Sequence, residues 1–153
     1  MIGDLVVSDA GPIIALAQLN ELDLLRSAFG RVVIPPAVRR ELRSVTPPLW
    51  IEVVHLRSIT APPSDLSKLG EGEREAITLA VELRPNHVLL DDLGARNRAQ
   101  QMGLRVIGTL GLLLYAKDAG LIRSLRPYLD ALRSSGSYIS DQLYNLALRD
   151  AGE

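Results

Sequence analysis

Short apolar runs alternate with longer amphipathic segments along this chain. Four of the runs, rich in valine, isoleucine and leucine, are too short for a helix and are typical of buried strands. These strands are expected at residues 5–8, 32–34, 87–90 and 105–107. Residues 50–56 alternate between apolar and polar side chains, which predicts an additional edge strand.

The amphipathic segments between these runs predict helices. Gly11-Pro12 and Pro36 mark helix beginnings, whereas Gly30 and Gly103 mark helix ends. The expected helices cover residues 11–19, 22–29, 36–43, 70–83, 93–102, 109–119, 125–133 and 141–151. The longest expected loop covers residues 44–67. This order of elements predicts an α/β fold, a three-layer α/β/α arrangement with a short, mainly parallel central sheet, in one domain over residues 1–153.

Five side chains assigned to the terminal helices are expected to pack in the core. Some of them could instead form a dimer surface or a surface for a protein partner. The residues concerned are Tyr128, Leu129, Leu132, Tyr138 and Tyr144.

Composition removes several classes of protein. The chain has 153 residues, of which 47% are hydrophobic, and this fraction is too high for a disordered chain. The absence of cysteine excludes disulfides, thiolate metal sites and a cysteine nucleophile. A net charge of −1 argues against a tail-type basic nucleic-acid binder but leaves a local basic patch possible. The longest apolar run, residues 110–116, is far short of the ~20 residues that span a membrane, so a soluble cytoplasmic protein is expected.

Acidic side chains follow two of the predicted strands. Asp9 comes after the first strand, and Asp91 and Asp92 come after the strand at 87–90. Thr109 follows the strand at 105–107. The carboxyl ends of parallel strands share one edge of a sheet, where ligands bind in such folds. A single aspartate in this position usually caps a helix, but two converging strand ends favour a site.

Two glutamates on predicted helices extend this acidic set. Apolar residues follow Glu73 at spacings of three, four and seven, so Glu73 is expected to face inward. Its neighbours Glu71 and Glu75 fall elsewhere on the helix and are expected to be solvated or to interact favourably with the helix dipole. Glu41 lies at the edge of an apolar stripe, and the alternative is an exposed glutamate among basic neighbours.

Clustered carboxylates repel one another, and a divalent cation relieves this repulsion. Oxygen ligands without thiolate or imidazole select hard ions, so the expected cofactor is Mg²⁺ or Mn²⁺. Such ions bind phosphate oxygens, and two of them can clamp a phosphodiester during hydrolysis. The acidic set therefore favours nuclease chemistry.

Five segments, in order along the chain, resemble the PIN-domain family, and more closely its compact prokaryotic members related to VapC-type toxins. They are residues 7–17 with their flanks, 34–42, 70–77, 89–96 and 106–111. The resemblance implies a metal-dependent endoribonuclease, the toxin of a type II toxin–antitoxin pair. It implies catalytic and metal-binding roles for Asp9, Glu41, Glu73, Asp91 and Asp92. Because neighbouring side chains on a strand point to opposite sides, one of the last two could cap the following helix instead.

The resemblance also bears on residues around the acids and on partners. Thr109 and Ser8 are expected beside the metal ligands. Arg96, Arg39 and Arg40 are candidate RNA contacts, although Arg96 is favoured as an ion-pair partner of Asp92 four residues earlier. The implied partners are an RNA substrate, a small antitoxin protein and a second copy of the chain, with no membrane.

Two alternative functions remain open from the sequence. The family commonly has Thr-Ser after its first aspartate, whereas this chain has Ala10-Gly11 and lacks those hydroxyls. This departure favours, as the alternative, a catalytically weak or inactive PIN-like module that binds RNA or protein. A phospho-receiver domain also places acids at strand ends. It expects an acid pair after the first strand and a lysine after the last, whereas Lys117 lies inside a predicted helix.

Overall fold

The computed structural model describes residues 3–57 and 66–153. The part of the expected loop at 58–65 lies outside these residues. The predicted strands are all confirmed, with ends that differ by at most three residues. They are β1 (Leu5–Ser8), β2 (Arg31–Ile34), β3 (Ile51–Val53), β4 (His87–Leu89) and β5 (Val106–Ile107).

The predicted helices are confirmed as well. They are α1 (Ala10–Gln18), α2 (Asp23–Ala28), α3 (Pro36–Glu41), α4 (Glu71–Leu83), α5 (Leu93–Gln101), α6 (Thr109–Asp118), α7 (Arg126–Ser134) and α8 (Asp141–Asp150). Helix α1 begins one residue earlier than expected, so Pro12 lies within its first turn rather than near its first position. Within the described ranges, no helix has the length and apolar character needed to cross a membrane.

The five strands form one parallel sheet in the order β3-β2-β1-β4-β5. The chain builds outward from β1 to β3 and then crosses, through α4, to β4 on the other side of β1. The strand order therefore reverses between β1 and β4, and this point is where open α/β sheets form their ligand sites. The Asp9 amide donates to the Leu89 carbonyl at 3.0 Å, so the β1–β4 ladder extends up to Asp9.

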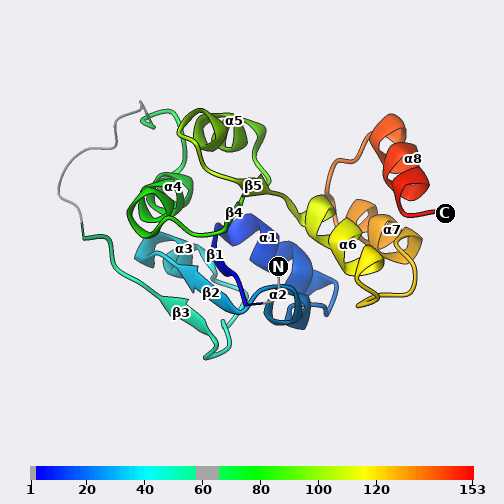
Figure 1. Cartoon of the computed structure of the whole chain (residues 1–153), viewed down its shortest axis with the longest axis horizontal. Coiled ribbons are helices and arrows are strands. Elements are labelled where there is room, and N and C mark those ends of the chain that lie inside the picture. The colour runs from blue at the N-terminus through cyan, green and yellow to red at the C-terminus, as the bar shows by residue number, and fades with distance from the viewer. Residues whose placement is uncertain (1–2, 58–65) are drawn as a thin grey trace.

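Helices cover both faces of the sheet (Figure 1). Helices α4 and α5 pack on one face, whereas α1, α2 and α6 pack on the other, and α3 lies against α4. The central strands are apolar and covered on both faces, with Val6, Val7 and Leu89 each 0% exposed, whereas the edge strands β3 and β5 are partly exposed. This burial on two sides accounts for strands that are continuously apolar instead of alternating.

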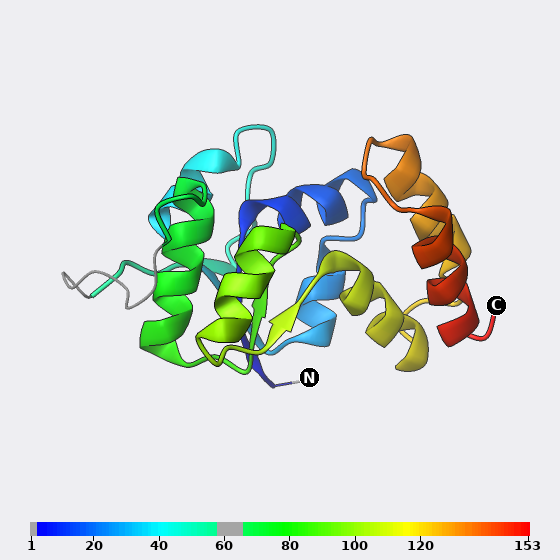
Figure 2. The same cartoon turned by 90° about the horizontal axis from the view of Figure 1, so that it is seen from above.

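Helices α7 and α8 extend the molecule beyond α6, as the view from above shows (Figure 2). The Arg133 guanidinium lies 4.2 Å from the centre of the Tyr144 ring, and the Tyr144 hydroxyl donates to Asp130 at 2.7 Å. These contacts fasten α7 to α8. The prediction of core packing is right for Leu129 and Leu132, but Tyr144 is only half-buried.

The prediction is partly right for one of the remaining tyrosines and wrong for the other. Tyr128 is half-buried and packs against the core, and its hydroxyl donates to Glu21 at 2.8 Å. Tyr138 is 92% exposed, because it lies in the turn between α7 and α8 and not on the packed face of either helix.

Glu153 caps the amino end of α7. Its carboxylate accepts hydrogen bonds from the Leu125 amide at 2.6 Å and the Ser124 hydroxyl at 2.7 Å, and Lys117 lies 3.6 Å away. These donors lower the pKa of Glu153 to about 2. A group with a lowered folded pKa stabilises the fold above its ordinary pKa and loses this effect as the pH falls.

Glu153→Gln is accordingly expected to lower the free energy of unfolding at pH 7 by about 1 kcal/mol, the usual value of a helix cap. The difference from wild type should shrink as the pH falls from 4.5 toward 2, where the wild-type carboxyl also becomes neutral. Urea unfolding at several pH values measures both quantities. A difference that stays constant down to pH 2 would contradict a role for the charge.

Candidate active site at the carboxyl edge of the sheet

Asp9 lies where β1 ends and α1 begins, next to β4. Its residue is 8% exposed, and its Oδ1 has no hydrogen-bond partner among the described residues. Burial raises the pKa of Asp9 to about 6, and the negative charges of Glu73, Glu41 and Asp91 add to the rise. Asp9 is therefore a buried carboxylate that the protein itself leaves only partly compensated.

Glu41 comes from the last turn of α3 and reaches the first turn of α4. Its Oε1 accepts a hydrogen bond from the Gly72 amide at 3.0 Å. A Cβ atom on Gly72 would lie 2.5 Å from the Glu41 Oε2, so only glycine leaves room for this carboxylate. The sequence analysis did not single out Gly72, although a glycine inside a helix is unfavourable enough to be a signal.

A glutamate of α4 in turn binds a backbone amide at the amino end of α3. Glu75 is half-buried, and its Oε1 accepts a hydrogen bond from the Ala37 amide at 3.0 Å. The expectation that Glu75 is solvated is therefore wrong, because the packing of α3 against α4 brings it to the amino end of α3. Glu71 is exposed as predicted and pairs with Arg40 at 2.6 Å. Helices α3 and α4 thus cap each other, which holds Glu41 at the site.

Glu73 is half-buried, and its Oε1 accepts a hydrogen bond from the Gly70 amide at 3.0 Å. Burial raises the pKa of Glu73, and so do the charge of Asp92, a hydrogen bond with Asp92 and the charge of Glu41. The Asp92 Oδ2 accepts a hydrogen bond from the Ala95 amide at 2.9 Å, so Asp92 is the aspartate that caps α5.

Asp91 is held by a single residue. Its Oδ1 accepts from the Thr109 amide at 2.7 Å, and its Oδ2 accepts from the Thr109 hydroxyl at 2.6 Å. Thr109 is buried at the start of α6, and Ser8 is buried under Asp9, where its hydroxyl donates to the Asp9 carbonyl at 2.9 Å. Both hydroxyl residues therefore contact an acidic residue of the site directly.

The three arginines lie differently from one another. The Arg96 Nη1 donates to the Leu90 carbonyl at 3.2 Å, and the side chain crosses Gly108 next to Asp91. The favoured pairing of Arg96 with Asp92 is wrong within the described residues, because the Asp92 carboxylate is turned back toward the α5 amides. Arg39 and Arg40 are exposed on α3.

These oxygens suit a hard divalent cation by their chemistry. The unpartnered Asp9 Oδ1 is a free ligand atom, and the carboxylates around it repel one another without a positive charge. Among residues 3–57 and 66–153, however, no three acidic or histidine side chains are arranged around one ion position. The hydrogen bonds to Gly72, Gly70 and Thr109 hold the other carboxylates to the backbone of neighbouring elements.

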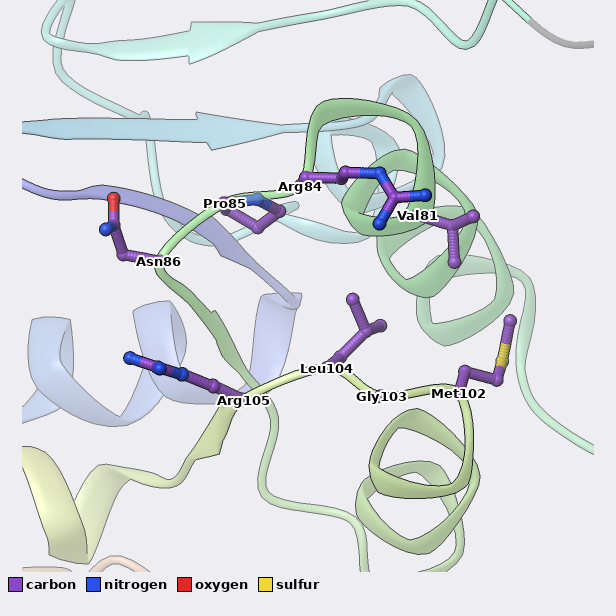
Figure 3. A pocket seen from close by; sticks show the side chains of 8 residues that line it. All are labelled: Val81, Arg84, Pro85, Asn86, Met102, Gly103, Leu104 and Arg105. Carbon is purple, nitrogen blue, oxygen red and sulfur yellow. The ribbon is translucent and has the colours of Figure 1, made fainter.

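Two cavities open at opposite edges of the sheet. A cavity of about 650 Å³ lies beside Asp91, with Arg96 and Tyr138 among its lining residues. A cavity of about 370 Å³ lies at the amino ends of the strands (Figure 3). In Figure 3 the side chains of Arg84 and Arg105 point in different directions, so they do not converge on one ligand. Of these two cavities, the first adjoins Asp91 and the second contains no acidic residue in its lining.

The fold and the acids at its switch point define an α/β protein with a carboxylate site between two central strands. A family model described as PIN domain matches residues 5–153, and the chain belongs to the PIN domain family, whose members are typically nucleases. A solved structure of a PilT N-terminus domain protein from the hyperthermophilic archaeon Sulfolobus solfataricus is 17% identical, with a TM-score of 0.47. The alignment covers 92% of this chain and 98% of that chain. No curated protein matches the sequence.

Proposed function

We propose that this protein is an endoribonuclease that depends on Mg²⁺ or Mn²⁺. The observation that carries the proposal is Asp9, a buried carboxylate with an oxygen that finds no partner in the described part of the chain and with three further carboxylates close enough to raise its pKa. An uncompensated buried charge of this kind destabilises a fold and is retained where it serves a site. Membership of a family of nucleases supports the same chemistry.

Asp9, Glu41, Glu73 and Asp91 would hold the cation. When bound, Mg²⁺ or Mn²⁺ attracts phosphate oxygens and makes water a stronger acid. Thr109 fixes the orientation of Asp91 through two hydrogen bonds. The role of Asp92 is to cap α5 and to position Glu73, so it acts through its neighbour instead of as a ligand.

The test is cleavage of a mixed RNA substrate with added Mn²⁺ by wild type, Asp9→Asn and Asp118→Asn. Asp118 is an exposed acid at the far end of α6 and serves as the matched control. Wild type and Asp118→Asn should cleave, and Asp9→Asn should lose at least about 100-fold of the rate, as expected for loss of a group that acts in the transition state. Equal rates for all three proteins would overturn the proposal.

Titration calorimetry with Mn²⁺ separates this function from its alternative. A nuclease binds the ion through Asp9, so wild type should give a binding isotherm and Asp9→Asn should not. No heat at millimolar Mn²⁺ would favour a binding module without catalysis. This test matters because both carboxylate oxygens of Asp91 already accept hydrogen bonds from Thr109.

A role as the toxin of a toxin–antitoxin pair is part of the same proposal. It requires a small protein partner that suppresses the ribonuclease. The sequence of the adjacent gene and the growth of cells that express this chain alone or with that gene test this role. Normal growth in both cases, with active wild-type enzyme in the extract, would contradict it. Light scattering of the purified chain measures the proposed homodimer.

A further inference from the structure

The cavity beside Asp91 is lined mostly by residues that do not belong to the acidic site. Asp91 and Arg96 contribute to its lining, and apolar side chains form much of the rest of the lining. Its volume of about 650 Å³ falls within the ~300–1,000 Å³ of pockets that hold small ligands. A group larger than a metal ion therefore fits next to the acids.

Tyr138 is the most exposed large hydrophobic residue of this lining. Tyr138 is 92% exposed, whereas the other five aromatic residues of the chain are buried or half-buried. Tyr138 thus contributes little to the packing of the fold. Leu93, at the start of α5 and 71% exposed, lines the same cavity.

The backbone that carries Tyr138 is nevertheless fixed. Gly136 has a φ of +101°, which ends α7 in a left-handed turn, and the Ser137 amide donates to the Leu132 carbonyl at 3.0 Å. On the other side, the Arg133 guanidinium donates twice to the Ile139 carbonyl, at 3.1 and 2.8 Å. The ring is therefore exposed on a held loop, which reduces the entropy that a ligand must remove on binding.

Arg96 gives this cavity a positive group close to the acids. One of its N–H groups is bound to the Leu90 carbonyl, and within the described residues the others have no hydrogen-bond acceptor in the protein. Gly108 makes this position possible, because a Cβ there would collide with the Arg96 Nη1. A guanidinium suits a phosphate oxygen, and an exposed aromatic ring suits the flat face of a base.

We propose that this cavity is a subsite for an unpaired nucleobase, with Tyr138 stacking on the base and Arg96 binding a phosphate of the same strand. The inference rests on the proposed ribonuclease function and adds to it a binding subsite for one base of the strand. A paired base is already stacked within a duplex and cannot offer its face to Tyr138. A protein segment in this cavity would need an apolar surface but no aromatic ring. Binding that depends on the Tyr138 ring therefore distinguishes a nucleobase from a protein segment.

The test measures RNA binding apart from cleavage. A short fluorescent single-stranded RNA is titrated with Asp9→Asn protein, alone and with Tyr138→Ala, Tyr138→Phe or Leu49→Ala added. Tyr138→Ala should weaken binding about fivefold or more, the lower end of the range for one base–aromatic stack. Tyr138→Phe should restore the affinity, and Leu49→Ala, which removes an exposed leucine outside the cavity, should leave it unchanged.

An RNA series with a single abasic nucleotide at successive positions locates the stacked base. At one position the abasic site should weaken binding to the parent protein about as much as Tyr138→Ala does. It should have no further effect on the Tyr138→Ala protein. A duplex of the same sequence should bind with equal affinity to the parent protein and to the Tyr138→Ala protein.

The outcomes separate the two proposals. Cleavage by wild type together with equal RNA affinity for Tyr138→Ala and its parent overturns the nucleobase subsite and leaves the ribonuclease function standing. Tyr138-dependent binding of single strands without any cleavage by wild type supports the subsite and overturns the ribonuclease function. Loss of affinity that Tyr138→Phe does not restore also overturns stacking, since the phenyl ring retains it.

Discussion

Asp9→Asn is expected to raise the melting temperature of the metal-free protein at pH 7 by roughly 2–8 °C. The reason is the position of Asp9, which is buried beside three other carboxylates and has an oxygen without a partner among residues 3–57 and 66–153. Because the pKa of Asp9 is raised to about 6 in the folded protein, its carboxylate is charged and buried at pH 7, whereas in the unfolded chain the same charge is exposed to water. The raised pKa corresponds to about 3 kcal/mol of lost stability, and a buried amide recovers about half of this.

The pH dependence follows from the same shift. A carboxyl group with a raised folded pKa stabilises the protein below its ordinary pKa, and this stabilisation is lost as the pH rises through the folded value. Wild type should therefore lose stability relative to Asp9→Asn between pH 3.8 and about 6, and it should be the more stable of the two proteins near pH 4. Differential scanning calorimetry in a chelating buffer measures this difference.

Divalent ions should reverse the order of stability. An ion that binds only the folded state raises the free energy of unfolding. The increase grows with the logarithm of the ratio of the ion concentration to its dissociation constant. Millimolar Mn²⁺ should raise the melting temperature of wild type and leave that of Asp9→Asn unchanged. A less stable Asp9→Asn protein at pH 7 in chelating buffer would show that Asp9 serves the fold, and it would count against an active-site role.

The location of the acids at one edge of the sheet could be predicted because it depends on local patterns. A short valine-rich run before Asp9 and a leucine-ended run before Asp91 predict buried parallel strands. The carboxyl ends of such strands must meet at one edge. The structure places β1 beside β4, so the two strands that end at these aspartates are neighbours.

The partner of each acid could not be predicted, because it depends on contacts between distant segments. Glu75 binds an amide 38 residues away, and Glu41 binds one 31 residues away. Helical periodicity gives the direction of a side chain relative to its own helix, but not the helix end that it meets. The assignment of Asp92 as the cap and Asp91 as the residue bound to Thr109 likewise requires the actual turn after β4.

Tyr138 shows a different limit of sequence analysis. An aromatic residue between two amphipathic helices is usually core, since burial of a large ring stabilises a fold. The residue falls instead in a turn that Gly136 opens, and it is 92% exposed. Exposure of this kind is decided by one or two backbone angles, and the apolar pattern of the flanking helices does not encode it.

Gly72→Ala is expected to reduce RNA cleavage about 10- to 100-fold, the usual effect of losing a group that orients a metal ligand. The added Cβ would lie 2.5 Å from the Glu41 carboxylate, which must leave the Gly72 amide. Stability should change by less than about 1 kcal/mol, because alanine favours the helix by about as much as the lost cap disfavours it. The variant therefore displaces one acid of the site without unfolding the protein.

Two further variants identify the cause of this loss. Gly11→Ala makes the same substitution in α1, where no heavy atom lies within 4 Å of the new Cβ, and it should cleave RNA like wild type. Glu41→Gln retains an oxygen that can accept from the Gly72 amide but removes the charge, so it should remain folded and lose activity. If Gly72→Ala cleaves normally while Glu41→Gln does not, the charge of Glu41 matters and its hydrogen bond to α4 does not. Normal cleavage by both variants would instead make Glu41 a helix cap alone, and the cation would depend on Asp9, Glu73 and Asp91.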